Sequence, residues 1–108
     1  MPKQWEIWYA NFAFEDNPSV VKKRPVLILD NKKVFPILVA KVTKTKPREE
    51  YWGEYSINKW QEAGLDYPST VRLSKRMSLE DSDLAYKIGQ LSISDIIEIQ
   101  KLISSKNE

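Results

Sequence analysis

The chain has 108 residues, of which 42% are hydrophobic and 30% are charged, and its formal net charge is +2. This length and balance are typical of one folded domain spanning residues 1–108, and they argue against a disordered chain. No apolar stretch approaches membrane-spanning length and no signal-peptide pattern stands at the start, so we expect a cytoplasmic protein with no membrane partner.

The chain contains neither histidine nor cysteine. Histidine is the side chain most used for acid–base catalysis near neutral pH, and the two residue types together supply most structural zinc ligands. The three glycines are far apart, so there is no glycine-rich phosphate loop. We therefore expect no metal and no cofactor, and any enzyme must work with Arg, Lys, Asp, Glu, Ser, Thr or Tyr.

The charge is unevenly distributed along the chain. Residues 1–48 carry ten Lys or Arg against four acids, whereas residues 49–108 carry seven against eleven. Such asymmetry can create one basic face that meets an anion. An ordinary patchy, solvated surface is an equally good interpretation.

The first half of the chain predicts three strands. Residues 5–12 are rich in aromatic side chains and favour a first strand, which a polar loop over 13–21 follows. Residues 24–30 predict a buried strand, because Pro25 can stand at a strand entry and an aliphatic run follows it. A turn over 31–33 leads to a third strand over 34–43, in which Pro36 indicates an edge or a bulge.

The middle of the chain predicts a loop over 44–53, a short strand over 55–57 and one capped helical turn over 58–64 that Gly64 ends. Residues 69–77 form the next predicted strand. Its alternation places four polar side chains in a row on one face. That row suits either a phosphate-backbone surface or the ordinary solvent face of a sheet. Its members are Thr70, Arg72, Ser74 and Arg76.

The end of the chain predicts a helix with Ser92 as its N-cap and Asp95 in the capping position three residues on. A broad apolar face at helical spacing is expected to pack against the sheet. It comprises Ile93, Ile96, Ile97, Ile99, Leu102 and Ile103. The fold class is therefore mainly β with a C-terminal helix (α+β), built on a small, strongly bent antiparallel sheet or barrel.

Four segments, in order along nearly the whole chain, resemble the PemK/MazF family of toxin endoribonucleases. The first is Arg24-Pro25-Val26-Leu27-Ile28-Leu29, which follows an aromatic first strand. The others are Val39-Ala40-Lys41-Val42-Thr43, residues 64–73 (GLDYPSTVRL) and residues 87–92 (KIGQLS).

The resemblance implies an SH3-like barrel and a homodimer. It also implies a sequence-specific, metal-independent endoribonuclease that cleaves single-stranded RNA (mRNA) and is neutralised by a cognate antitoxin protein. The family's catalytic arginine, threonine and later-strand arginine match Arg24, Thr43 and Arg72. Attack by the 2′-hydroxyl would explain the choice of RNA over DNA. Arg24 would stabilise the phosphorane, and Thr43 and Arg72 would bind or orient the phosphate. The general base stays open, with Glu15 and Asp16 as candidates and a solvated loop as the alternative.

Basic, hydroxyl and aromatic residues outside these positions are candidates for RNA binding. They are Lys22, Lys23, Lys41, Lys44, Lys46, Arg48, Trp52, Thr70, Ser74 and Arg76. Trp52 is the best candidate for stacking on a base, because a tyrosine and a glycine flank it beside a basic run. Trp5 and Trp8 are more typical of core aromatics.

The chain departs from the family pattern at two positions. Trp5 stands where the family has a glycine, and Ser74 stands where some members carry an acidic residue. A binding-only module with the same barrel is therefore an alternative function. A gyrase poison of related fold is a third, but that class ends in Trp-Gly-Ile, whereas this chain ends in Ser105-Lys106-Asn107-Glu108.

Overall fold

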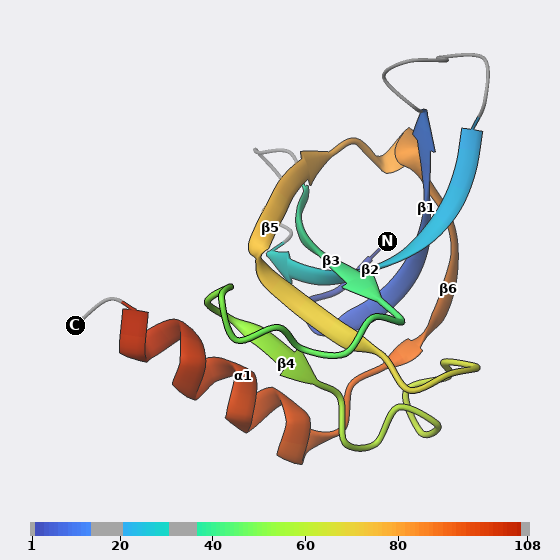
Figure 1. Ribbon diagram of the computed structural model, residues 1–108. Helices are drawn as coiled ribbons and strands as arrows, with labels where there is room; N and C mark the ends of the chain where they lie inside the picture. The colour runs from blue at the N-terminus through green and yellow to red at the C-terminus, as the bar shows by residue number, and fades with distance from the viewer. Residues whose placement is uncertain (1, 14–20, 31–36, 107–108) are drawn as a thin grey trace.

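The fold is an antiparallel six-stranded sheet with one helix packed against it (Figure 1). The computed structural model describes residues 2–13, 21–30 and 37–106. The strands are β1 (Glu6–Ala13), β2 (Val21–Asp30), β3 (Ile37–Thr43), β4 (Glu54–Ser56), β5 (Thr70–Leu79) and β6 (Leu84–Gln90). A 3₁₀ turn, η1 (Asp81–Asp83), precedes β6, and the chain continues into α1 (Ile93–Lys106). Within these residues, no helix is long and apolar enough to cross a bilayer.

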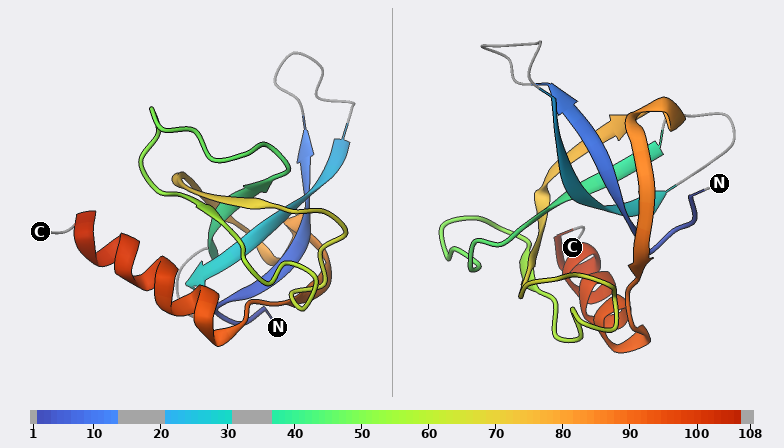
Figure 2. Two further views of the ribbon diagram at one scale, coloured as in Figure 1. Left: turned by 60° about the horizontal axis from the view of Figure 1, so that its bottom comes forward. Right: turned by 90° about the vertical axis from the view of Figure 1, so that its right-hand side faces the viewer.

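The order of the strands is β4-β5-β3-β2-β1-β6. The sheet bends strongly, and α1 lies along one side of the molecule beside β4 (Figures 1 and 2). The predicted fold class is confirmed. Over the described residues β4 and β6 remain at opposite edges of the hydrogen-bonded ladder, so the sheet is bent like a barrel but is not closed.

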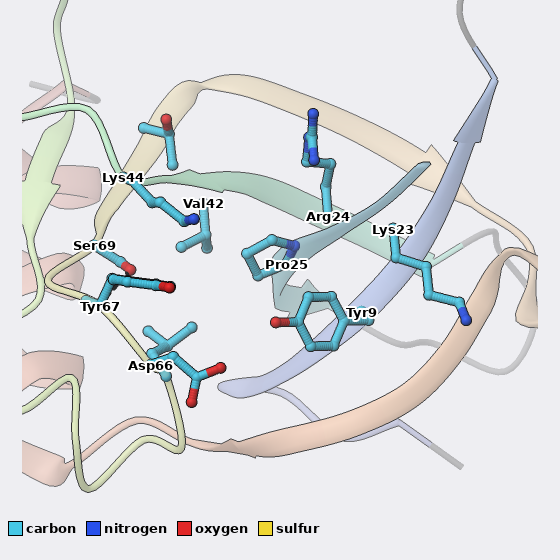
Figure 3. A pocket seen from close by; sticks show the side chains of 11 residues that line it. Tyr9, Lys23, Arg24, Pro25, Val42, Lys44, Asp66, Tyr67 and Ser69 are labelled. Carbon is cyan, nitrogen blue, oxygen red and sulfur yellow. Dashed lines mark hydrogen bonds between the residues drawn. The ribbon is translucent and has the colours of Figure 1, made fainter. Parts of the chain in front are cut away.

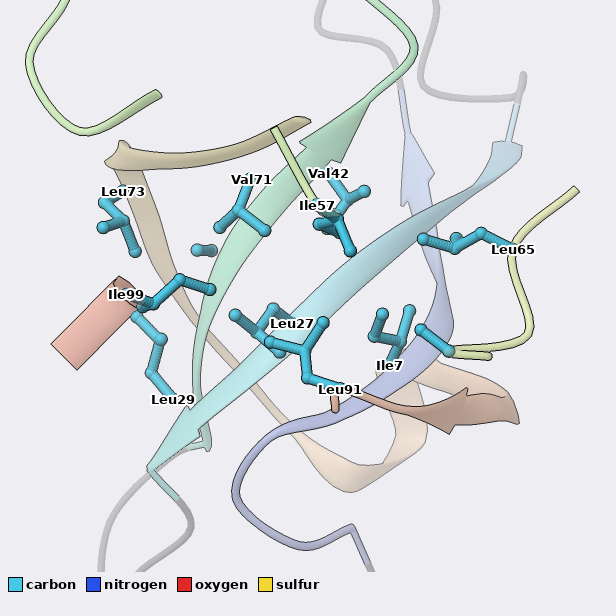
Figure 4. Close-up of a cluster of buried hydrophobic side chains, with 12 residues drawn as sticks. Ile7, Leu27, Leu29, Val42, Ile57, Leu65, Val71, Leu73, Leu91 and Ile99 are labelled. Atoms are coloured by element: carbon cyan, nitrogen blue, oxygen red, sulfur yellow. The ribbon is translucent and has the colours of Figure 1, made fainter. Parts of the chain in front are cut away.

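Both faces of the sheet are buried, which explains the continuous apolar run of β2. Val26, Leu27 and Ile28 are all fully buried although their side chains alternate between faces. One face, with α1 and the segment after β4, encloses a first cluster (Figure 4). Its buried members are Ile7, Leu27, Leu29, Ala40, Val42, Ile57, Ala63, Leu65, Val71, Leu73, Leu91 and Ile99. The opposite face carries a second cluster of Ala10, Val26, Ile28, Ile37, Val39 and Leu79.

β5 is more irregular than its sequence pattern predicts. Its register against β3 shifts between Arg72 and Arg76, so three residues of β5 are skipped at that point. The predicted single row of polar side chains is therefore interrupted. Thr70 is buried, and Arg72 is half-buried, while Ser74 and Arg76 are exposed.

The structure confirms that the predicted turn over 58–64 ends at Gly64. The amide of Leu65 donates to the carbonyl of Trp60 at 3.1 Å, and the amide of Gly64 donates to that of Gln61 at 3.1 Å. This pair of bonds is the Schellman arrangement, and Gly64 takes the required left-handed conformation at φ +89°. The turn lies against β6, since a Cβ added at Gly89 would meet the carbonyl oxygen of Ala63 at 2.2 Å.

Helix α1 begins at the predicted N-cap, and Asp95 in its first turn also binds residues outside the helix. Ser92 Oγ accepts the amide of Asp95 at 3.3 Å, which confirms the N-cap. Asp95 is fully buried. Its carboxylate accepts hydrogen bonds from two backbone amides outside the helix, those of Asn58 at 2.9 Å and Lys59 at 3.0 Å. It also accepts a short hydrogen bond from the hydroxyl of Tyr55. Burial alone would raise the pKa of Asp95, but these hydrogen bonds outweigh it and lower the pKa.

The expectation of a continuous apolar face on α1 is only partly right. Ile99 is buried, and Ile96, Leu102 and Ile103 pack partly buried against the first cluster. Ile93 and Ile97, which lie four residues apart, are 76% and 45% exposed. The helix rests on the sheet through a narrower stripe than the sequence indicates.

Two other elements differ from expectation. β6 was not predicted as a strand, although it pairs with β1 over nearly its whole length. The predicted third strand begins at residue 34, and residues 34–36, with Pro36, lie outside the described residues, as does the predicted turn over 31–33. The core role expected for Trp5 and Trp8 is confirmed, since both pack partly buried against the two clusters.

Trp5 has an unusual backbone. It adopts φ +71°, a left-handed conformation that favours glycine and costs other residues about 1–2 kcal/mol. Its amide donates to the carbonyl of Ile28 at 2.8 Å and its carbonyl accepts the amide of Leu91 at 3.0 Å. The two bonds hold the chain in this conformation at the point where it enters β1.

We expect Trp5→Gly to be more stable than Trp5→Ala by about 1 kcal/mol, because both lose the indole but only alanine keeps a Cβ at positive φ. Urea unfolding of the two variants measures the difference. At the exposed strand residue Ser78 the order should reverse, with Ser78→Ala more stable than Ser78→Gly. Equal urea midpoints for Trp5→Gly and Trp5→Ala would show that the backbone at residue 5 is not strained.

Asp95→Asn should lower the free energy of unfolding at pH 7 by about 2–3 kcal/mol, the scale of hydrogen bonds to a charged group. The folded pKa of Asp95 is lowered, so its contribution is present above the unfolded pKa of about 3.9 and is lost as pH falls toward the folded pKa. The gap between wild type and Asp95→Asn should therefore narrow below about pH 4. Denaturant titrations at pH 7, 5 and 3 test this, with the exposed Glu62→Gln as the control.

Candidate active site

A pocket of about 410 Å³ opens at one end of the sheet face that carries the first cluster (Figure 3). Residues from β1, β2 and β3 form one side, and the segment between Gly64 and β5 forms the other. The lining residues are Tyr9, Lys23, Arg24, Pro25, Val42, Thr43, Lys44, Leu65, Asp66, Tyr67 and Ser69.

Strand register sets the floor of the pocket. Tyr9 of β1 lies directly opposite Pro25 of β2, so the two rings share one face of the sheet. Continuing the register of β2 with β3 brings Val42 beside Pro25. The floor is therefore rigid and largely apolar, and it ends where β2 meets its basic residues.

The rim of the pocket is strongly basic. Lys23, Arg24 and Lys44 line it, and all three are exposed. Asp66 is the one carboxylate among the lining residues that the structure describes. Arg24 pairs with no carboxylate among residues 2–13, 21–30 and 37–106. Three cations against one carboxylate favour the binding of a phosphate group.

Thr43 lies where β3 ends. Its Oγ1 accepts the backbone amide of Thr45 at 3.2 Å, which turns the chain out of the strand. This turn places Lys44 over the ring of Tyr67, with its Nζ 4.0 Å from the ring centroid. Thr43 and Arg24 therefore line the same pocket from neighbouring strands.

The opposite wall comes from the segment that leads into β5. Ser69 Oγ donates to the carbonyl of Tyr67 at 2.8 Å, and the carbonyl of Ser69 accepts the amide of Ile57 at 2.9 Å. These bonds tie the wall to the end of β4. Figure 3 shows the hydroxyls of Tyr67 and Tyr9 both directed toward the middle of the pocket.

Tyr9 is held from behind by β6. Its ring lies 5.1 Å from that of Tyr86, its partner in the register, with the two planes tilted by 53°. Burial is the largest cause of a raised pKa for Tyr9, and the nearby Tyr86, Asp66 and Tyr67 contribute further. The phenol is therefore protonated at neutral pH.

Arg72 does not line the pocket. Its Nε lies 2.6 Å from Oε2 of Glu54, whose side chain is fully buried, while the Arg72 side chain is 16% exposed. Glu54 also accepts the amide of Arg48 at 2.9 Å, and both guanidiniums lie over the ring of Tyr51 at about 5 Å. Burial alone would raise the pKa of Glu54, but these hydrogen bonds and the two positive charges lower it. Arg72 thus anchors the 44–53 loop to β4 and β5.

The other residues predicted for RNA binding are scattered. Lys22, Lys41, Lys46, Ser74 and Arg76 are exposed but do not line the pocket. Trp52 packs against the first cluster, and the ammonium of Lys106 lies 4.6 Å from its ring centroid. Glu15 and Asp16, the predicted candidate bases, lie outside the described residues.

Three polar lining residues are not predicted from the sequence, namely Tyr9, Asp66 and Ser69, whereas Tyr67 is among the aromatics that could stack on a base. Asp66 and Ser69 lie within the segment 64–73 that carries part of the family resemblance, where Pro68 is a loop signal. Tyr9 could be found only from its pairing with Pro25, which requires the strand register.

A family model described as a PemK-like, MazF-like toxin of type II toxin–antitoxin systems matches residues 3–105. The chain belongs to this family. Its members are known as endoribonucleases, so the pocket lies in a protein of a ribonuclease toxin family. No curated protein matches the chain at a significant level.

Solved structures of such toxins share the fold. The Mycobacterium tuberculosis toxin MazF-mt6 is 26% identical, with a TM-score of 0.66, and the match covers 93% of each chain. MazF in a MazE–MazF structure from Deinococcus radiodurans is 18% identical, with a TM-score of 0.71 over 98% of this chain and 96% of that one. An endoribonuclease in complex with its cognate antitoxin, from a mycobacterial species, is 10% identical, with a TM-score of 0.69 over 96% and 90%.

We expect Arg72→Leu to destabilise the MazF-like chain by about 3 kcal/mol, because it leaves the buried Glu54 carboxylate without its main partner. The double variant Arg72→Leu/Glu54→Leu should recover about half of that loss, since it removes the buried charge as well. Urea unfolding of both variants measures the coupling. Additive losses would show that the Arg72–Glu54 pair does not anchor this loop.

Proposed function

We propose that the protein is a metal-independent toxin endoribonuclease that cleaves single-stranded RNA at specific sequences in this pocket. The observation that carries the proposal is that Arg24 and Thr43, from two different strands, line one basic pocket. Membership of the toxin family supports it, as does the likeness to proteins named as endoribonucleases.

We assign neutralisation of the charge on the reacting phosphate to side chains of the protein. Among the residues that the structure describes, no group of three carboxylates or other ligands lies together in a way that could hold a metal ion. Arg24 stands at the pocket mouth on the rigid strand β2, and a guanidinium keeps its charge at any physiological pH. It would stabilise the phosphorane that forms when the 2′-hydroxyl attacks the phosphorus, a role worth about 3–4 kcal/mol.

Thr43, Lys44 and Lys23 would position the chain of the RNA. The hydroxyl of Thr43 donates to Thr45 Oγ1 at 3.3 Å in the structure, and it would turn from that partner to donate to a phosphate oxygen while its own oxygen still accepts the amide of Thr45. The two ammoniums would bind the neighbouring phosphates as point charges. DNA would not be cleaved, because the attacking 2′-hydroxyl is absent.

The general base must remove the proton of the 2′-hydroxyl. Glu15 and Asp16 remain the candidates from the sequence, since they come shortly before Arg24 along the chain. Asp66 is a third candidate, because its carboxylate lines the pocket. Cleavage by the variants Glu15→Gln, Asp16→Asn and Asp66→Asn would separate the three.

The partners follow from the family. A cognate antitoxin protein would neutralise the toxin by covering the basic pocket. The MazE–MazF structure from Deinococcus radiodurans and the mycobacterial endoribonuclease bound to its cognate antitoxin support a partner of this kind. We also propose a homodimer that acts in the cytoplasm.

A second candidate function is binding of RNA or an antitoxin without cleavage. The observation that favours it is the pairing of Arg72 with Glu54, which leaves one of the three family positions outside the pocket. Ser74 stands where some members of the family carry an acidic residue, so this position supplies no carboxylate.

Arg24→Ala should reduce the rate of RNA cleavage by about 10²–10³, the loss typical of removing one preorganised charge donor. The assay uses purified protein and a long synthetic RNA in EDTA, with mapping of the new ends as 2′,3′-cyclic phosphates. Because Arg24 is exposed, the midpoint of unfolding should not change.

Lys101→Ala is the matched control. It removes an exposed cation of α1 that pairs only with Glu98 at 3.3 Å among the described residues, and cleavage should continue at the wild-type rate. Intact RNA with the folded wild-type protein would overturn the nuclease proposal and favour the binding-only function. Cleavage that Arg24→Ala leaves unchanged would place the reaction elsewhere.

A further inference from the structure

We propose that Tyr9 is the proton donor to the leaving 5′-oxygen of the RNA. The inference deepens the proposed function and rests on it, because it concerns the same pocket and the same cleavage. Transesterification needs a proton for the departing oxygen, and the chain has no histidine to supply one.

The position of Tyr9 suits this role. Its ring lies opposite Pro25 on the pocket floor, and Arg24 lines the same pocket. Figure 3 shows its hydroxyl directed toward the middle of the pocket rather than into the sheet. The ring of Tyr86 packs behind it at 5.1 Å and fixes its orientation. A phosphate held by Arg24 and Thr43 would therefore meet the phenol from the floor of the same pocket.

The hydroxyl of Tyr9 is also unoccupied within the part of the chain that the structure describes. Its pKa is raised by burial and by neighbouring groups, and no hydrogen bond contributes. A half-buried phenol normally finds a polar partner. A phosphate oxygen or a leaving oxygen in the pocket would supply that partner.

The other proton-bearing groups of the pocket suit the role less well. Arginine side chains are not proton donors in general acid catalysis, because a guanidinium is not deprotonated in proteins. The ammonium of Lys44 lies over the ring of Tyr67 at 4.0 Å, and that of Lys23 lies 5.9 Å from the ring centroid of Tyr86. Thr43 Oγ1 is within hydrogen-bond distance of Thr45 Oγ1, at 3.3 Å. The hydroxyls of Tyr9 and Tyr67 both face the middle of the pocket (Figure 3). Tyr67 is 54% exposed and lies under Lys44 on the opposite wall, whereas Tyr9 lies on the floor beside Pro25 and is protonated at neutral pH.

The proton balance of the step is simple. The 2′-oxygen forms a bond to phosphorus as the bond from phosphorus to the 5′-oxygen breaks, and the Tyr9 proton passes to that oxygen. The proton of the 2′-hydroxyl leaves to the base, and the tyrosinate then takes a proton from water. The products are a 2′,3′-cyclic phosphate and a free 5′-hydroxyl.

A substrate with a sulfur atom in place of the scissile 5′-oxygen tests the assignment. A thiolate leaves without being protonated, because thiols are far more acidic than alcohols. We expect Tyr9→Phe to slow cleavage of ordinary RNA by about 10²–10⁴, the range for general acid catalysis, and to cleave the sulfur-substituted RNA within about tenfold of the wild-type rate. Arg24→Ala should slow both substrates alike, since its charge acts on the phosphorane.

Tyr51→Phe is the matched control, because it removes a phenol of the 44–53 loop that does not line the pocket, and both substrates should be cleaved at the wild-type rate. Urea unfolding confirms that Tyr9→Phe keeps its ring packing. If Tyr9→Phe slows both substrates equally, or neither, Tyr9 is not the proton donor. If the wild-type protein cleaves neither substrate, the proposed function itself fails.

Discussion

The buried carboxylate of Asp95 holds together parts of the molecule that are far apart in the sequence. It accepts hydrogen bonds from Tyr55 of β4 and from the amides of Asn58 and Lys59, so it caps the 58–64 turn from the start of α1. That turn ends at Gly64, and the residues after it form one wall of the pocket. A single ionised group thus connects the helix, the edge strand and the candidate active site.

The pocket gains its properties from where it lies on the sheet. The apolar face that packs against α1 continues to its edge through Val42 and Pro25, and the basic residues of β2 and the end of β3 begin there. Exposed cations are thereby held at the rim of an apolar floor. Arg72 lies outside this edge, and its charge is neutralised by the buried Glu54.

The sequence predicts the local structure better than the site. The apolar run after Pro25, the glycine that ends the 58–64 turn and the Ser92 cap each depend on neighbouring residues, and all three are confirmed. β6 was missed because Leu84–Gln90 mixes apolar, charged and glycine residues without a clean alternation, and its place is set by pairing with β1. Asp95 is expected in the capping position of its own helix, where its carboxylate accepts a hydrogen bond from Ser92 Oγ at 3.0 Å. Its further partners on β4 and the turn depend on tertiary packing.

The same difference between features set by neighbouring residues and features set by tertiary packing applies to the candidate site. The family resemblance leads to Arg24 and Thr43, which line the pocket, and to Arg72, which does not. Tyr9 and Asp66 come together only through strand pairing and the return of the chain toward β5, and neither contact can be read from spacing along the sequence. The distribution of charge along the sequence identifies the basic half of the chain. It does not show which of these cations lie together at the rim of the pocket.

The dependence of the pocket wall on Asp95 has a consequence for the order of events during synthesis. α1 follows every strand in the chain, so the amides of Asn58 and Lys59 gain their carboxylate partner only after the whole sheet has been made. Until Asp95 has been made, the turn that leads into the opposite wall of the pocket lacks the carboxylate that holds it. The basic side of the pocket, with Arg24, therefore precedes in synthesis the group that holds the other side.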